Sequence, residues 1–401
     1  MRRHPTPGPR ALHVATRNWR HTLCFVALLA PVSRELLAGG SVTWSRDLPE
    51  GVYRVTVELG GDDTDSMTTC KGEARRLFVL GEKVPKGDTV TKAFLVDVHR
   101  REFPGATVSL KPREVGSPNW DDRLTLEFLG DKARVRNVSA EPLPADAAVT
   151  RIFLAGDSTV TDQAREPYAG WGQMLPLFFG REAVVANHAE SGLALSSFRG
   201  GRRLDKILSQ LRPGDFVLIQ FGHNDQKSKG ADAGPFAGYA AALIDYVERI
   251  REHGGRPVLV TPVARRRFDD TGTVVESLGD FPEAVRRVAK EKQVPLVDLN
   301  AMSKRLYQAM GVEGSKSVFL HLPAKTHPGQ DDPIRDDTHF SNYGGYEIAR
   351  CVVEAIRTGV PELAALLAPA VTPFDPDHPD PPSAVAIPSS PFETLTVPDG
   401  R

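Results

Sequence analysis

The sequence predicts an α/β fold, with a doubly wound parallel sheet and helices on both faces, preceded by a smaller antiparallel β-sandwich. Two observations predict it. Residues 41–145 alternate apolar and polar side chains with a period of two, which is typical of strands with one buried face. Residues 150–365 alternate continuously apolar stretches with helical stretches, which is typical of parallel strands covered on both faces.

In the N-terminal half, the alternation is clearest in "VYRVTVEL", which places Tyr53, Val55, Val57 and Leu59 on one face. The segment "RLTLEF" at 123–128 repeats the pattern, and "RRLFVL", "KAFLVDVH" and "ATVSLKP" predict further strands. Short turns rich in Gly, Asp and Pro separate them. This arrangement indicates a β-sandwich.

In the C-terminal half, the predicted strands are "RIFLAG", "AVVANH", "DFVLIQFG", "RPVLVTPV" and "VPLVDL". The predicted helices cover 173–179, 204–211, 236–253, 281–293 and 343–356. In a doubly wound sheet, functional groups collect at the carboxyl ends of the strands. We therefore expect the site at the residues that follow these strands.

The two ends of the chain have a different character. Residues 1–40 contain arginines followed by "LCFVALLAPV", which predicts a leader with a possible signal segment too short to span a bilayer. Export to the periplasm or exterior is one interpretation, and a start placed upstream of the true one, or a disordered leader, is the other. Residues 369–401 are rich in Pro and lack periodicity, which predicts a disordered tail.

Charge and cysteine content narrow the classes of partner. The chain of 401 residues has 50 Lys and Arg against 51 Asp and Glu, a formal charge of −1, which argues against nucleic acid or an anionic membrane as partner. Cys24, Cys70 and Cys351 are far apart and are expected to be free thiols. The His and Asp residues within 321–339 are irregularly spaced, so we expect neither a metal nor a cofactor. Composition leaves the oligomeric state open.

Polar or small residues follow three of the predicted strands and precede the last predicted helix. Ser158 follows "RIFLAG", Gly192 follows "AVVANH" and Asn224 follows "DFVLIQFG". Asp336 and His339 lie in "RDDTHFSNYGG". Each residue has an ordinary structural explanation as a cap, turn or surface group, but their coincidence at one edge of the sheet favours a shared function.

Acyl-transfer chemistry assigns roles to these residues. A serine hydroxyl becomes a nucleophile when an imidazole removes its proton, and a carboxylate then orients the imidazole. Ser158, His339 and Asp336 are the candidate catalytic set. Asp337 is the alternative carboxylate, and the three-residue spacing favours Asp336 because a short loop folds it under the ring more easily.

A tetrahedral intermediate also needs donors for its oxyanion. The backbone N–H groups of Ser158 and Gly192 and the side-chain amide of Asn224 are the candidates. Gly156 permits the sharp turn before Ser158. The candidate substrate-binding residues are Trp171, His223 and Asp225, although Trp171 either lines the cleft or packs beneath it.

The blocks "GDST", "NHAESG", "FGHND" and "DDTH" resemble, in order and spacing, those of the SGNH (GDSL-type) hydrolases. The family name denotes a serine, glycine, asparagine and histidine, which here stand at 158, 192, 224 and 339. "GWGQMLP", "TPVARRRFDDTG" and "VPLVDLNAMSKRLY" are similar to rhamnogalacturonan acetylesterases, some of which carry a galactose-binding-like sandwich. The resemblance implies the three-layer, flavodoxin-like SGNH fold. "GLALSSFRGGRRL" departs from the family pattern beside the cleft.

The resemblance implies a serine esterase that removes O-acetyl groups from plant cell-wall polysaccharide, with acetylated rhamnogalacturonan as the expected partner. Two alternatives keep the chemistry: an acetylesterase acting on xylan, and a small-ester lipase or thioesterase. An alternative of another class is a carbohydrate-binding protein whose α/β part has lost its activity. The complete set of Ser158, Gly192, Asn224, Asp336 and His339 argues against that loss.

Overall fold

The structure, a computed structural model, describes residues 1, 35–37, 41–61, 63–230, 233–391 and 398–399. The compact unit of the chain spans Pro31–Arg401. Most of the predicted leader, including its signal segment, lies outside the described residues. In the described part of the chain, no helix combines the length and the apolar character that a membrane crossing needs. Cys70 and Cys351 are buried free thiols.

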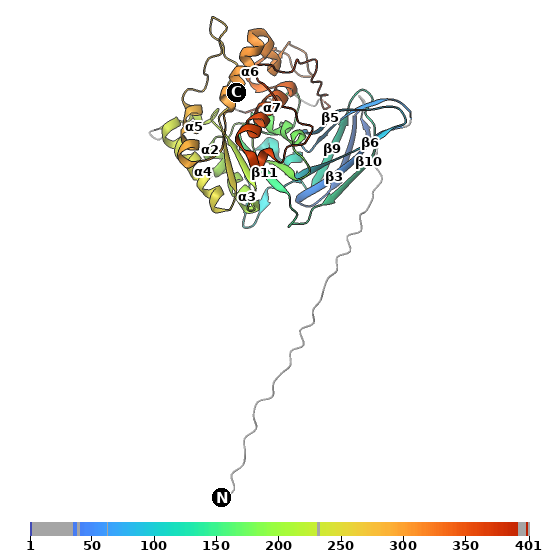
Figure 1. Ribbon diagram of the computed structural model, residues 1–401, viewed down its shortest axis with the longest axis horizontal. Coiled ribbons are helices and arrows are strands. Elements are labelled where there is room, and N and C mark those ends of the chain that lie inside the picture. Colours follow the sequence, from blue (N-terminus) through green and yellow to red (C-terminus); the bar gives the residue numbers. More distant parts are fainter. Residues whose placement is uncertain (2–34, 38–40, 62, 231–232, 392–397, 400–401) are drawn as a thin grey trace. The chain divides into compact units, whose positions relative to one another are not determined.

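The N-terminal part of the compact unit consists of two antiparallel sheets, here called the sandwich (Figure 1). One sheet has the order β1-β2-β9-β4-β5 and the other the order β10-β3-β6. The predicted inner face is confirmed, because Tyr53, Val55, Val57 and Leu59 are all buried. The strands are β1 (Glu35–Leu37), β2 (Ser41–Asp47), β3 (Gly51–Gly60), β4 (Ser66–Gly72), β5 (Arg76–Val84), β6 (Thr89–Val98), β9 (Arg123–Leu129) and β10 (Val135–Pro142).

Strands β2, β4 and β10 were not predicted from the sequence. β4 reads "SMTTCKG" and lacks apolar alternation, yet Thr68, Thr69 and Lys71 are buried within it. The segment "ATVSLKP" was predicted to be a strand over its whole length. In the structure only its first two residues form a strand, β8 (Ala106–Thr107), which pairs with β7 (Glu102–Phe103). Burial of polar side chains by neighbouring segments is not visible in the local pattern.

The C-terminal part contains the predicted parallel sheet, with the order β12-β11-β13-β14-β15. Its strands are β11 (Thr150–Gly156), β12 (Ala183–Asn187), β13 (Phe216–Gln220), β14 (Arg256–Val260) and β15 (Leu296–Val297). A separate antiparallel pair, β16 (Phe319–Leu322) and β17 (Ile334–Phe340), follows. The α/β prediction is therefore confirmed, and β11 lies beside β12 and β13, so the chain segments that follow these three strands emerge side by side.

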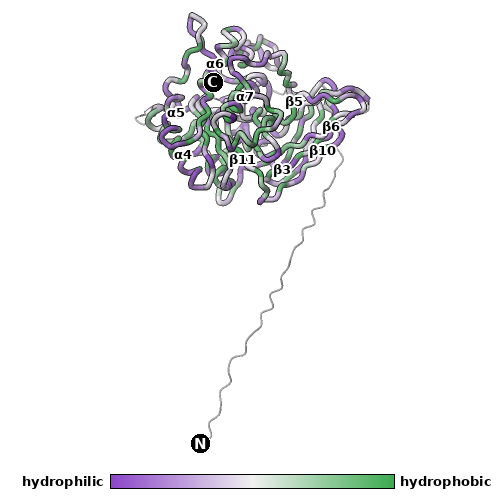
Figure 2. The backbone as a smooth tube through the Cα atoms, viewed as in Figure 1, coloured by the Kyte–Doolittle hydropathy of each residue, from purple (hydrophilic) through white to green (hydrophobic). Residues whose placement is uncertain are grey.

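Helices cover both faces of this sheet because the strands are apolar on both sides. Ile152 and Leu154 face one core, together with residues of α1, α6 and α7, while Phe153 and Ala155 face the other, with α3, α4 and α5 (Figure 1). Hydrophobic segments lie inside and hydrophilic ones along the outer helices (Figure 2). The helices are α1 (Trp171–Met174), α2 (Leu195–Gly200), α3 (Arg203–Gln210), α4 (Ala240–Glu252), α5 (Phe281–Lys292), α6 (Leu299–Gly314), α7 (Asn342–Gly359) and α8 (Pro361–Ala364).

Buried ion pairs join the sandwich to the α/β part. Arg76 of β5 donates from Nε to Asp162 Oδ2 at 2.6 Å, and the exposed fraction of either side chain is at most 1%. Arg203 of α3 contacts both carboxylate oxygens of Glu114 at 2.5 Å. If one partner of such a pair is removed, the other charge remains buried without a partner, which is strongly destabilising. These contacts therefore hold the sandwich against the α/β part.

We expect Asp162→Asn to lower the free energy of unfolding by about 3 kcal/mol, because Arg76 would keep a buried charge without its partner. Asp162 also accepts a hydrogen bond from Asn187 Nδ2 at 2.7 Å. In Asp162→Asn, the new NH₂ group would therefore face a donor, either Arg76 or Asn187. Urea denaturation measures the change. Asp47→Asn is the matched control, since Asp47 pairs with Arg123 at the surface and should change stability by less than about 1 kcal/mol. Equal effects of the two substitutions would contradict a buried, coupled pair.

The prediction of a disordered tail is wrong for residues 369–391. Phe374 and Val385 are buried, and Tyr343 donates its hydroxyl to the Asp380 carbonyl at 2.5 Å. Farther along, Lys71 Nζ donates to the Pro388 carbonyl at 2.7 Å. The segment lacks helix or strand, as its proline content predicts, but it packs through isolated apolar side chains and side-chain hydrogen bonds.

Candidate active site

Ser158 lies in the turn that follows β11. Val160 N–H and Thr161 N–H both donate to the Asp157 carbonyl at 3.1 Å, which closes the turn. A Cβ at Gly156 would lie 2.5 Å from Val160 Cγ2 and 3.1 Å from the Gln220 carbonyl oxygen. Gly156 is therefore needed for close packing, rather than for an unusual backbone conformation, as the turn folds back onto the strand.

Ser158, His339 and Asp336 form one chain of hydrogen bonds. His339 Nε2 lies 3.0 Å from Ser158 Oγ, and His339 Nδ1 lies 2.9 Å from Asp336 Oδ2. The residues are buried, with exposed fractions of 2%, 0% and 2% for Ser158, His339 and Asp336. The arrangement has the connectivity that activates a serine hydroxyl: a ring nitrogen at the hydroxyl and a carboxylate at the other nitrogen.

The segment that carries His339 is a strand, not the loop that the sequence predicted. In β17 the register shifts, since Phe319 pairs with Phe340 whereas Leu320 pairs with Asp336, and the extra residues bulge out. Asp336 Oδ1 accepts the N–H groups of Thr338 at 2.9 Å and of His339 at 3.0 Å, which fixes the bulge.

The local electrostatics keep Asp336 ionised. Burial by itself raises the pKa of the Asp336 carboxyl, but the hydrogen bond and charge of His339 and the backbone N–H donors outweigh burial, so the pKa falls below its usual value. The carboxylate is thus ready to orient the imidazole. Asp337, the alternative, lies elsewhere: its Oδ1 is 2.8 Å from His321 Nε2 and 3.0 Å from Arg266 Nη1.

Gly192 and Asn224 lie after the two strands that flank β11. Gly192 has a φ of +76°, the left-handed region in which a side chain is strained. Asn224 Nδ2 donates to the carbonyl of Leu193 at 3.1 Å, so the amide is adjacent to Gly192. The structure therefore brings together the two segments from which oxyanion donors were predicted.

The predicted substrate-binding residues point inward instead. Trp171 is 1% exposed and donates its indole N–H to Gln220 Oε1 at 2.9 Å, so it packs beneath the site. His223 Nδ1 lies 3.1 Å from Asp157 Oδ2. Asp225 accepts the N–H groups of Leu195 and Gly222, both at 3.0 Å, and burial raises its pKa to about 7. These three side chains pack against the loops around Ser158, and their role in substrate binding stays a prediction.

Several residues near the site were missed in the sequence. Gln163 Nε2 donates to the Ser158 carbonyl at 3.0 Å and to Ser191 Oγ at 3.2 Å. From the sandwich, Lys111 Nζ donates to the Ser191 carbonyl at 2.6 Å, and Arg113 pairs with Glu190. The sequence contains no local signal for the two sandwich residues, because they meet this loop only through tertiary contacts.

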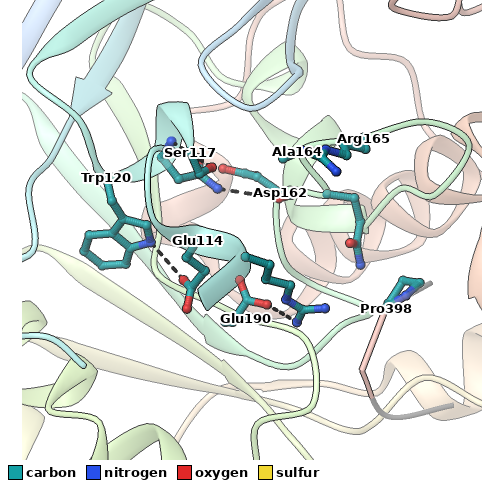
Figure 3. Close-up of a pocket in the computed structure, with 11 residues that line it drawn as sticks. Glu114, Ser117, Trp120, Asp162, Ala164, Arg165, Glu190 and Pro398 are labelled. Atoms are coloured by element: carbon teal, nitrogen blue, oxygen red, sulfur yellow. Dashed lines mark hydrogen bonds and ion pairs between the residues drawn. The ribbon is translucent and has the colours of Figure 1, made fainter. Parts of the chain in front are cut away.

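A pocket of about 130 Å³ lies between the sandwich and the α/β part (Figure 3). The sandwich lines it with Arg113, Glu114, Ser117, Asn119 and Trp120, and the α/β part with Asp162, Gln163, Ala164, Arg165 and Glu190, next to Pro398. It adjoins the Ser158 turn through Gln163. Among the described residues, no group of His, Cys, Asp and Glu side chains is placed to hold a metal ion.

Comparison with known proteins identifies relatives of this chain. The family model for the GDSL-like lipase/acylhydrolase family matches residues 154–345, which include Ser158 and His339. Rhamnogalacturonan acetylesterase RhgT of Bacillus subtilis (strain 168) is 44% identical over 208 residues, 51% of this chain and 89% of that protein. The probable rhamnogalacturonan acetylesterase YesY of the same organism is 32% identical over 209 residues, 51% of this chain and 92% of that protein.

Among solved structures, the Bacillus subtilis protein YxiM is similar, with a TM-score of 0.48 and 24% identity, over 79% of this chain and 80% of that chain. The matches to the two acetylesterases cover about half of this chain.

Proposed function

The chain belongs to the SGNH (GDSL-type) hydrolase family and is a carboxylic ester hydrolase, and from this premise we propose that it is a serine esterase that removes O-acetyl groups from rhamnogalacturonan. The observation that carries the proposal is the hydrogen-bonded chain Ser158–His339–Asp336, with distances of 3.0 and 2.9 Å.

In the proposed reaction, His339 Nε2 takes the proton of Ser158 as Oγ bonds to the acetyl carbon. The tetrahedral intermediate then collapses, and the sugar oxygen leaves with the proton from His339. A water molecule, deprotonated by the same imidazole, attacks the acetyl-serine. The second intermediate collapses to acetic acid, and Ser158 Oγ leaves with the proton from His339. Asp336 stabilises the imidazolium that forms in each half-reaction.

The oxyanion of each intermediate is assigned to the backbone N–H groups of Ser158 and Gly192 and to the Asn224 amide. A single such donor typically contributes on the order of 100- to 1,000-fold in rate. The contact of Asn224 with the Leu193 carbonyl supports the assignment, because it places the amide next to Gly192.

The polysaccharide substrate rests on the relatives, whose printed names are rhamnogalacturonan acetylesterase and probable rhamnogalacturonan acetylesterase. We propose the same substrate here, and export of the protein to meet a polymer that cannot enter a cell. Acetylated xylan and longer-chain esters are the alternatives that retain the mechanism.

The test is acetate release from acetylated rhamnogalacturonan, with acetylated xylan and long-chain acyl esters as comparison substrates. We expect kcat/KM for rhamnogalacturonan to exceed that for xylan by at least about tenfold, which corresponds to a modest difference in binding the transition state. Equal values would widen the specificity to acetylated glycans in general. If folded protein released no acetate from any polymer, the carbohydrate-binding alternative would replace the proposal.

A further inference from the structure

Two cationic side chains of the sandwich reach the loop that carries Gly192. Lys111 precedes the short 3₁₀ helix η1 (Pro112–Glu114), which also carries Arg113. Lys111 Nζ donates to the Ser191 carbonyl at 2.6 Å, and Arg113 Nη2 donates to the same carbonyl at 3.1 Å. Both cations therefore lie one residue from Gly192, although they belong to the sandwich.

A carboxylate of the chain's own C-terminal region occupies this position. Asp399 Oδ2 lies 2.9 Å from Lys111 Nζ and 3.5 Å from Arg113 Nη2. The hydrogen bond from Lys111 holds the pKa of Asp399 below its usual value. A Cβ at Gly192 would lie 2.6 Å from Asp399 Cβ, so the aspartate lies directly against the glycine. The position accepts an anion beside the proposed oxyanion donors.

The charges around the pair favour a second anion. Glu190 is the carboxylate paired with Arg113, and burial together with the nearby Glu114 raises the pKa of Glu190 to about 7. Near neutral pH, Glu190 therefore neutralises Arg113 only in part. Glu114 accepts hydrogen bonds from Arg203 at 2.5 Å, from the Trp120 indole N–H at 3.0 Å and from the Lys111 backbone N–H at 2.8 Å, whereas Lys111 Nζ donates to Ser191 and Asp399 instead.

One of the two cations lines the pocket between the sandwich and the α/β part. Arg113, Glu190 and Pro398 line this pocket (Figure 3), and Pro398 directly precedes Asp399, the partner of Lys111. Asp399 is 56% exposed, whereas Lys111 and Arg113 are 27% and 26% exposed. Because Asp399 is more exposed than the two cations that it contacts, a ligand carboxylate can displace it from Lys111 and Arg113.

We propose that Lys111 and Arg113 form a carboxylate subsite for a uronate residue of the polysaccharide, and that Asp399 occupies this subsite until the substrate displaces it. The inference rests on the proposed function, since it concerns the sugar next to the acetylated one. The sandwich is then part of the substrate site.

The test compares two matched substrates: acetylated rhamnogalacturonan oligosaccharides, and the same oligosaccharides after chemical reduction of their uronate carboxyls to neutral sugars. For the wild type, we expect a lower KM for the acidic form. Lys111→Gln and Arg113→Gln should each raise that KM about tenfold, the typical effect of losing one charge-assisted hydrogen bond, and should remove the preference. Asp399→Asn should lower the KM for the acidic form because it removes the competing carboxylate.

Lys132→Gln is the matched control, because it removes one positive charge from an exposed position of the sandwich. The subsite would be overturned if the wild type had equal KM values for the two substrates, or if the Lys111 and Arg113 variants kept the preference for the acidic form. In either case, acetate release would still support the esterase. If the wild type released acetate from neither substrate, the proposed function would fail, and calorimetry with an unacetylated galacturonate oligosaccharide would then decide the subsite. If the wild type binds the oligosaccharide and Lys111→Gln binds it more weakly, the subsite is supported. If the wild type does not bind it, the subsite is refuted.

Discussion

Ser158→Ala is expected to lower kcat for acetate release by about 10⁵- to 10⁶-fold, because the loss of a nucleophile removes the acyl-enzyme route as a unit. Ser158 Oγ has His339 Nε2 as its partner at 3.0 Å, and the alanine retains the Cβ that fills the turn. The fold should therefore persist. Steady-state acetate release measures the rate, and thermal unfolding checks the fold.

Ser209→Ala is the control for this variant. Ser209 Oγ donates to the Lys206 carbonyl within α3, away from the site, and its removal should leave kcat within about twofold, as for an ordinary surface substitution. A folded Ser158→Ala protein with more than about a tenth of the wild-type kcat would show that another residue attacks the ester.

Asp336→Asn is expected to lower kcat by about 10⁴-fold, through the wrong tautomer of His339. Asp336 Oδ1 accepts two backbone N–H groups, so the asparagine oxygen must stay at that position and its NH₂ must face His339 Nδ1. Nδ1 then accepts and Nε2 carries the proton. With a proton on Nε2, the ring cannot take another from Ser158.

Asp337→Asn separates this effect from a general change of charge. Asp337 is 44% exposed and pairs with Arg266 and His321, so its neutral variant should retain kcat within about threefold. If kcat fell strongly in Asp337→Asn and only slightly in Asp336→Asn, Asp337 and not Asp336 would be the carboxylate that orients His339. The two variants have the same composition, which makes the comparison direct.

The parallel sheet and the edge where the site lies follow from local sequence. Continuously apolar strands such as "RIFLAG" predict a sheet covered on both faces, and the end of such a strand predicts where Ser158 emerges. Gly192 and Asn224 follow the next two predicted strands, so the sequence places them at the same edge of the sheet, and the structure shows that these strands lie on either side of β11. Helix α2 was missed because it is only 6 residues long, and α6 because its apolar side chains are not gathered on one face.

The orientation of side chains around the site could not be predicted in the same way. Trp171, His223 and Asp225 belong to segments that flank Ser158, and the sequence does not reveal which face of each segment is buried. The structure turns all three inward: Trp171 donates to Gln220, His223 Nδ1 lies beside Asp157, and Asp225 accepts backbone N–H groups. A residue in a segment next to the site can therefore pack beneath it instead of facing the substrate.

The sequence by itself determined the α/β fold, the sandwich before it and the residue types needed for ester hydrolysis, because strand periodicity and the residues after each strand are local properties. The tertiary structure alone decided the pairing of His339 with Asp336 through the bulge in β17, the packing of residues 369–391, and the position of Lys111 and Arg113 beside Gly192. These depend on contacts between residues far apart in the chain, and no local pattern records which distant segment will bury a charge or shift a register.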